Sequence, residues 1–222
     1  ADKKTLFVPS LLSPVPPAAL GSIWVSDDEI TEQRRYYVFN YCPTTTFFRL
    51  LQKLLVLAEW ETQVHWRFGV VLQDTRRTAQ VFISLDLESK TVKLIVRGRQ
   101  QVLKMVAIAE AIETIMAEAS TSKRHKYTAV VPCRHCIQEG RESDASLYPL
   151  ATLEAAVNKN PANALVNCFS GKKPRTVRVD WLAPDVALST FSGDRIEFKD
   201  IELGDTIGEG GYATVYKGKW KG

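Results

Sequence analysis

Apolar and polar residues alternate along three consecutive stretches in the first half of the chain: residues 64–70, 81–87 and 92–97. This period of two predicts strands with one buried face. The connections at 74–77 and 89–90 are short and polar. Short connections favour pairing between consecutive strands, so the three strands should form an antiparallel meander.

Helical spacing appears at two other places. Residues 44–57 begin on threonines that can cap a helix, and apolar residues then recur at intervals of three and four. Residues 101–119 repeat this pattern, with glutamates on the opposite side. Further strands are predicted at 36–41, 127–131 and 176–181, and a short helix at 147–157. The predicted fold class is α+β, with an antiparallel-rich sheet packed by amphipathic helices.

The first 30 residues lack either period and form a separate segment. Prolines are concentrated within residues 1–22, where they disfavour regular hydrogen-bonded structure. We expect this segment to be an extended, proline-rich lead-in that lies across the surface of the following domain. Its abrupt start indicates that more protein precedes it.

Composition and charge narrow the functional class. The net charge is +4, with 45% hydrophobic and 24% charged residues, as in ordinary soluble domains. No partner nucleic acid is expected, because the basic clusters at 34–35, 123–126 and 172–175 are interpreted as solvated loop charge. We find no signal peptide and no apolar run of about 20 residues that could span a bilayer. The predicted location is cytoplasmic, with its four cysteines reduced.

The most specific motif lies near the C-terminal end. Its flanks, an isoleucine before the first glycine and Val-Tyr-Lys-Gly after the turn, indicate the strand–turn–strand loop that covers ATP phosphates in protein kinases. Small residues let the backbone approach phosphate closely, and alanine stands in place of the third glycine. The alternative is a plain glycine-containing hairpin. The candidate ATP-binding residues are Ile207, Gly208, Glu209, Gly210, Gly211, Tyr212, Ala213, Thr214 and Val215.

Phosphoryl transfer needs more than this loop. Kinases also use a lysine on the next strand and two aspartates further on, and the sequence reaches Gly222 before any of them. We therefore expect no catalytic residue and no enzyme activity in this chain. ATP and Mg²⁺ would bind in a longer parent protein only.

Cysteines supply a second candidate site. Cys133 and Cys136 form a C-x-x-C pair that could bind zinc together with Cys168 and either His125 or His135. A second C-x-x-C is missing, so the sequence does not complete a ligand set. The preferred interpretation is a loop with partly buried cysteines. No strand-to-helix pattern surrounds the pair, which argues against a thioredoxin-like redox site.

The order of these segments resembles the Roco family, in which a Roc GTPase domain is followed by a COR domain and often by a kinase. The resemblance covers residues 5–198, which are similar to the C-terminal half of COR, and the kinase start follows. It implies a lead-in at 1–30, the COR half at 31–198 and a truncated kinase start at 199–222. The stretches that carry it are 7–12, 37–39, 48–51, 66–72, 92–98 and 132–136.

The resemblance also implies a function. COR domains mediate dimerisation and relay the state of the GTPase to the kinase. The implied partners are a second copy of the chain and the Roc and kinase domains of a serine/threonine kinase parent, in which Roc would bind GTP and Mg²⁺. Two alternatives stay open: a zinc-stabilised binding domain centred on Cys133 and Cys136, and an unrelated regulatory domain next to a kinase.

Overall fold

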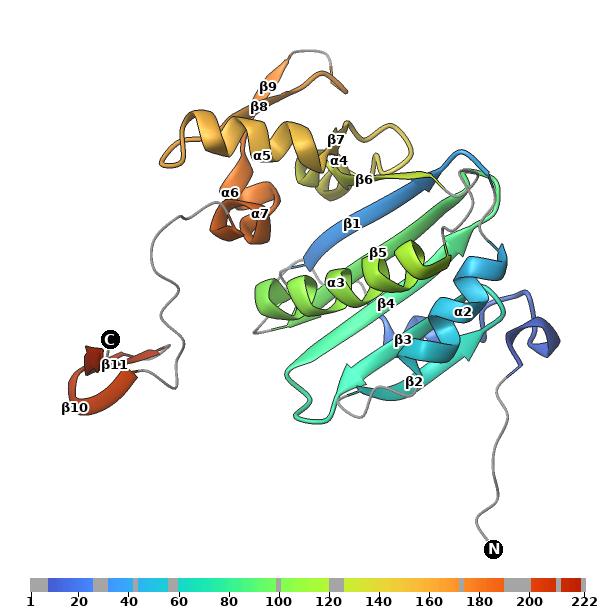
Figure 1. The fold of residues 1–222 in the computed structure, drawn as a ribbon, viewed down its shortest axis with the longest axis horizontal. Coiled ribbons are helices and arrows are strands. Elements are labelled where there is room, and N and C mark those ends of the chain that lie inside the picture. The colour runs from blue at the N-terminus through green and yellow to red at the C-terminus, as the bar shows by residue number, and fades with distance from the viewer. Residues whose placement is uncertain are drawn as a thin grey trace, which may run out of the picture. The chain divides into compact units, whose positions relative to one another are not determined.

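A seven-stranded antiparallel sheet organises most of the chain (Figure 1). The computed structural model describes residues 8–25, 32–41, 44–55, 60–98, 101–119, 126–171, 174–189, 201–210 and 213–220. The strand order is β2-β3-β4-β5-β1-β6-β7, which confirms the α+β class and the antiparallel meander. The single strand predicted at 64–70 is wrong, because residues 67–68 form a turn that separates β2 from β3, and these two strands pair with each other. The strands are β1 (Glu32–Phe39), β2 (Trp60–Trp66), β3 (Gly69–Asp74), β4 (Ala79–Asp86), β5 (Thr91–Gly98), β6 (Tyr127–Pro132) and β7 (Leu147–Pro149).

Strand β1 is inserted in the middle of the sheet, between β5 and β6. It begins at Glu32, four residues before the predicted start at Tyr36, and therefore contains Arg34 and Arg35. The interpretation of this arginine pair as solvated loop charge is wrong. Both side chains have carboxylate partners that are distant in sequence, and such partners allow charged groups to lie inside a sheet.

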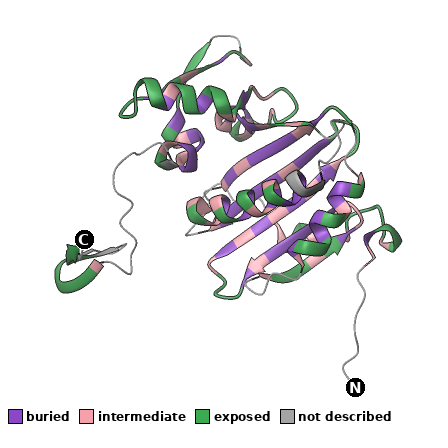
Figure 2. Ribbon diagram, viewed as in Figure 1, coloured by how far each residue is buried: buried purple, intermediate pink, exposed green. Residues whose placement is uncertain are grey.

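Two helices, α2 (Thr44–Leu54) and α3 (Gln101–Ala119), cover one face of the sheet (Figure 1). They bury one side against inward-facing residues of the strands, including Leu72, Ile83 and Leu94, and Figure 2 shows this buried surface. Helix α2 has a single buried side, and Arg49 is exposed rather than buried with an acidic partner. This layer holds the main hydrophobic core.

The lead-in packs against the opposite face of the sheet. Strand residues alternate between faces, so Phe82 and Arg97 point away from the helices. The Trp24 ring lies 5.3 Å from the Phe82 ring, and the Arg97 guanidinium lies 3.8 Å from the Trp24 centroid. The expectation of a surface-lying segment is thus correct for residues 8–25, although two short helices, η1 (Pro9–Leu11) and α1 (Leu20–Ile23), interrupt it.

Residues 131–189 form a smaller lobe with its own hydrophobic core, called the small lobe below. The predicted helix at 147–157 begins only at Leu150, after β7, and the predicted strand at 176–181 ends at Arg178. Val179 and Leu182 are both buried at helical spacing, which explains the turn into a helix. The lobe contains α4 (Arg134–Gln138), α5 (Leu150–Lys159), β8 (Leu165–Cys168), β9 (Arg175–Arg178), α6 (Val179–Leu182) and α7 (Pro184–Ser189).

The chain divides into two compact units, Ala1–Thr190 and Phe191–Gly222. The second unit contains the antiparallel hairpin of β10 (Ile201–Gly210) and β11 (Ala213–Trp220), which are the two strands predicted on either side of the glycine-rich turn. In the described part of the chain, no helix is both long and apolar enough to cross a membrane. Residues 123–125 and 172–173 of the other two basic clusters lie outside the described residues.

Candidate functional site

A buried ion pair joins the central strand to the last helix of the small lobe. The Arg35 guanidinium, on β1, donates to the Asp185 carboxylate at the start of α7. Both residues are only 7% exposed. A second carboxylate, Glu113 on α3, lies 3.7 Å from Arg35 and accepts a hydrogen bond from Tyr37 at 3.2 Å. One cation therefore connects three elements, and α7 packs on both α3 and α5.

The opposite face of β1 is tied to the small lobe as well. Glu142, in the loop after α4, accepts a hydrogen bond from the Tyr36 hydroxyl at 2.8 Å and pairs with Arg34 at 3.1 Å. Lys93 of β5 also lies 3.2 Å from this carboxylate. Burial would raise the pKa of Glu142, but these three partners outweigh it and hold the pKa below its ordinary value. Polar contacts on both faces of β1 thus link the sheet to the small lobe.

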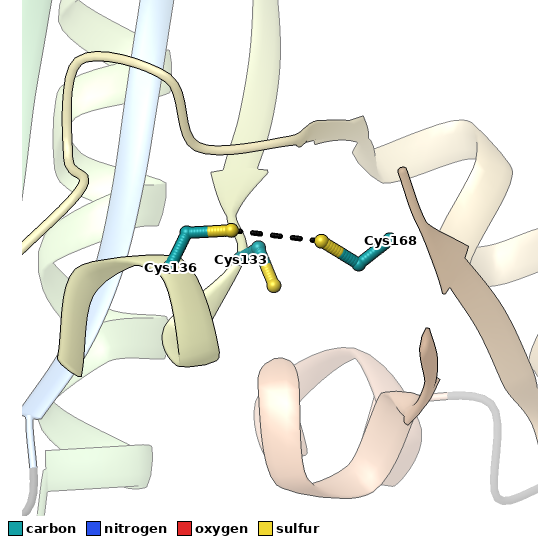
Figure 3. Close-up of side chains that lie close together, drawn as sticks. All are labelled: Cys133, Cys136 and Cys168. Atoms are coloured by element: carbon teal, nitrogen blue, oxygen red, sulfur yellow. Dashed lines mark hydrogen bonds between the residues drawn. The ribbon is translucent and has the colours of Figure 1, made fainter. Parts of the chain in front are cut away.

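Three thiols meet inside the small lobe (Figure 3). Cys133 and Cys136 lie at the start of α4 and within it, and Cys168 ends β8. Their sulfur atoms all lie within 4.8 Å of one another, and those of Cys136 and Cys168 are 3.5 Å apart. All three residues are buried, so the expectation of a loop with partly buried cysteines is wrong. Residue types and positions are those that can hold a thiophilic metal.

The histidines do not join this cluster in the described part of the chain. The His135 ring packs against Trp181 in a tilted arrangement with centroids 4.4 Å apart, and His135 is absent from the group of potential ligands. His125 lies outside the described residues. The structure therefore brings the three predicted cysteines together, whereas the predicted ligand His135 contacts Trp181 instead of the sulfurs.

The surroundings of the thiols affect them unequally. Burial raises the pKa of the Cys133 thiol to about 11. Burial also acts to raise the pKa of Cys168, but hydrogen bonds from the Ser146 hydroxyl and the Ser170 backbone N–H outweigh it and lower that pKa to about 7. The Tyr148 hydroxyl is buried beside the cluster and has no hydrogen-bond partner among the described residues.

The glycine-rich hairpin presents its candidate residues on paired strands. Gly208 pairs with Val215, Glu209 with Thr214, and Gly210 with Ala213. Gly211 and Tyr212 lie outside the described residues. Ile207 and Val215 are 67% and 55% exposed, and a side chain added at Gly208 would approach only Val215, at 3.9 Å. The open backbone at Gly208 fits the approach of a phosphate group.

A sequence comparison then gives the family. The profile described as "C-terminal of Roc, COR-B domain" matches residues 31–185, well over half of the chain. The chain belongs to the COR-B family of Roco proteins. The matched COR-B region spans the whole ion-pair connection from Arg35 to Asp185 and includes the three thiols.

Several Dictyostelium discoideum proteins are similar to this COR-B chain. Probable serine/threonine-protein kinase pats1 is 32% identical over 219 residues, which is 98% of this chain and 7% of that protein. Probable serine/threonine-protein kinase roco9 is 23% identical over 99% of the chain and 7% of its own length. Roco7, with the same description, is 24% identical over the full chain and 9% of its own length. The COR-B chain thus spans less than a tenth of each of these relatives.

Some residues of the COR-B site could not be selected from the sequence alone. Asp185 is one of many scattered carboxylates, and Glu142 lies in a charged loop. The available signal was the position of Arg34 and Arg35 directly before an aromatic, strand-forming run, which could have extended that strand. Their partners are 108 and 150 residues away, a separation that no local pattern indicates.

Proposed function

We propose that this COR-B chain is a dimerising, regulatory relay module that couples a Roc GTPase domain to a serine/threonine kinase domain in the cytoplasm. The main supporting observation is the order of elements: a COR-B region followed by a glycine-rich hairpin. Relatives that align with 98–100% of the chain, this hairpin included, are named probable serine/threonine-protein kinases. The chain itself transfers no phosphate in this proposal.

Helix α7 is the element we assign to the relay. It is the last described element of the first unit, and Asp185 at its start pairs with Arg35 in the middle of the sheet. An intact buried ion pair holds its two side chains in one arrangement. Breaking the pair leaves a buried charge without its partner, which is energetically costly. Movement of the sheet would therefore be transmitted to α7 and to the segment that leads to the hairpin.

The hairpin would serve as the ATP-covering loop of the kinase. Gly208 and Gly210 would let backbone N–H groups approach the phosphates, and the exposed side chains of Ile207 and Val215 would be available to contact the nucleotide. ATP with Mg²⁺ supplies the phosphoryl group when bound in the complete kinase, and GTP with Mg²⁺ would be bound by the Roc domain.

We assign self-association to the outer edge of β2. Among the described residues, no strand pairs with that edge. Sheet edges are usually protected from pairing by lysine, proline or cover. Strand β2, with the sequence Trp-Glu-Thr-Gln-Val-His-Trp, contains neither residue, and, besides β3, α1 of the lead-in contacts it. Two copies of an edge strand can pair antiparallel across a twofold axis without any change in the fold of either chain.

The relay is tested by Asp185→Asn in a polypeptide that carries this chain between a Roc domain and a complete kinase domain. We expect basal phosphorylation to persist while the difference in kinase activity between the GTP-loaded and GDP-loaded forms shrinks. Asp180→Asn is the matched control, because Asp180, on α6, forms an exposed ion pair with Arg178. A variant whose hydrogen exchange shows a loosened α7 but whose nucleotide response is unchanged would contradict the relay.

A further inference from the structure

We propose that Cys133, Cys136 and Cys168 bind one zinc ion that holds the small lobe together. The three sulfurs come from two segments, the β6–α4 junction and the end of β8, and all lie within 4.8 Å of one another. Thiolates around a tetrahedral zinc at Zn–S distances of about 2.3 Å lie about 3.8 Å apart. The observed 3.5 Å between Cys136 and Cys168 is close to that spacing (Figure 3).

Each sulfur also has a nearby hydrogen-bond donor of the kind that stabilises a metal-bound thiolate. The backbone N–H of Cys136 lies near the Cys133 sulfur and acts to lower its pKa, and the Arg141 cation lies close enough to the Cys136 sulfur to interact with it. Cys168 accepts from the Ser170 backbone N–H and lies 3.4 Å from the Ser146 hydroxyl. Donors around coordinating sulfurs tune and orient metal ligands, whereas three cysteines that only fill an apolar core require none.

A fourth ligand position can be occupied by water. The Tyr148 hydroxyl is buried beside the sulfurs and has no hydrogen-bond partner among the described residues. Its surroundings include Cys133 and Cys168, both of which interact with it. These two thiols are near enough to serve as its partners, so the hydroxyl does not by itself require a water. The ligands inferred from the described residues are therefore the three thiolates, since His135 lies against Trp181 and His125 falls outside the part of the chain that the structure describes.

The chemistry of the ligands and their burial indicate the metal and its role. Thiolates select zinc, copper(I) or iron–sulfur clusters over calcium and magnesium. Cys133 and Cys136 are 0% exposed and Cys168 is 3% exposed, so the site has no surface open to a substrate. A structural ion is the consistent reading, because small hydrophobic cores are commonly supplemented by a metal. The ion would fix β8 against α4.

Metal content of the full 222-residue chain, purified without chelator, tests the site. Native mass spectrometry and elemental analysis should find about one equivalent of zinc. Replacing it with Co²⁺ should produce the charge-transfer absorption of a cobalt thiolate. Cys168→Ser and Cys136→Ser should lose the metal, whereas the matched control Cys42→Ser should retain it.

The structural role has its own readout. A strong chelator should lower the thermal unfolding temperature and make residues 131–189 sensitive to protease before the rest of the first unit. Purified protein with no zinc and no cobalt absorption would overturn the proposal. A disulfide between Cys136 and Cys168, found by peptide mapping, would overturn it as well. If the serine variants fail to fold, zinc stoichiometry and the cobalt spectrum of the unaltered chain still decide.

Discussion

At the scale of single residues, the contact between Arg35 and Asp185 carries the connection between the two cores. Both side chains are buried, and when Asp185 is removed the more distant Glu113 is the carboxylate that still lies near Arg35 among the described residues. Breaking a buried pair costs more than the pair contributes, because the remaining charge stays desolvated. The loss of stability on breaking this pair can be measured with variants of Asp185.

We expect Asp185→Ala to lower the free energy of unfolding of the first unit by about 3–5 kcal/mol. Urea unfolding, followed by circular dichroism, measures it. The matched control is Asp180→Ala, which removes an equally charged partner from an exposed arginine on the same lobe and should leave stability almost unchanged. Equal effects of the two variants would contradict a structural role for the buried pair.

Asp74 gives a prediction about pH. Its carboxylate is 2% exposed and accepts backbone hydrogen bonds from Thr78 and Ala79 at 2.7 and 2.8 Å. Burial would raise its pKa, but the hydrogen bonds from Thr78 and Ala79 and the charge of Lys104 outweigh burial and lower the pKa. A lowered folded-state pKa stabilises the protein above the unfolded value of about 3.9, and this stabilisation is lost as the pH falls through the folded value.

Asp74→Asn should therefore reduce stability by about 1–3 kcal/mol at pH 7, since charged hydrogen bonds are weakened. The difference from the unaltered protein should begin to shrink below about pH 4, where Asp74 of the unfolded chain becomes protonated, and should continue to shrink as the pH approaches the lower pKa of the folded state. Urea unfolding of both proteins across this range measures the difference. A difference that stays constant with pH would show that the charge of Asp74 contributes nothing.

At the scale of elements, the sequence predicts well where one periodic pattern is uninterrupted. Strands β4 and β5 and helices α2 and α3 match alternation or helical spacing in the sequence. The alternation at 64–70 was misleading, because it continues across the turn at 67–68 between β2 and β3. The strand predicted at 176–181 failed beyond Arg178, because three alternating apolar residues also fit the start of a helix at Val179. Strand β8 is only four residues long, too short for a period of two to be recognised, so no pattern indicated it.

The same limit applies to the candidate site. The C-x-x-C pair indicated two sulfurs close together, but only β8 brings Cys168 beside them. The pairing of Arg35 with Asp185 depends on α7 folding back against α3, which is a tertiary contact. Local patterns therefore predicted the residue types of the site and not the distances among them.

The outer edge of β2, with which no described strand pairs, can be tested by changing one residue. Gln63 is exposed on this strand, at the point where its register with β3 shifts between Thr62 and Val64. Gln63→Lys should weaken self-association several-fold, because a lysine on each copy would place like charges at the paired edge. Sedimentation equilibrium measures the dissociation constant.

Asn158→Lys is the matched control for this experiment, since it adds the same charge to an exposed position of α5. The control should keep the original dissociation constant. If Gln63→Lys dimerises as strongly as the unaltered chain, the contact lies on another surface than the β2 edge.

At the scale of the whole molecule, the chain consists of a COR-B domain with two hydrophobic cores and a glycine-rich hairpin in a separate unit. The larger core carries the sheet edge that we assign to pairing. The small lobe carries the thiol cluster and α7, which leads toward the hairpin. Dimerisation of the sheet and relay through α7 are the two parts of the proposed function.

Light scattering of the purified chain over a wide concentration series tests whether the chain associates with itself, on which the proposed function depends. If the chain dimerises as proposed, the average mass will rise with concentration from the 24.9 kDa of one chain toward twice that value. A mass that stays at 24.9 kDa up to the highest soluble concentration would contradict self-association by this COR-B chain.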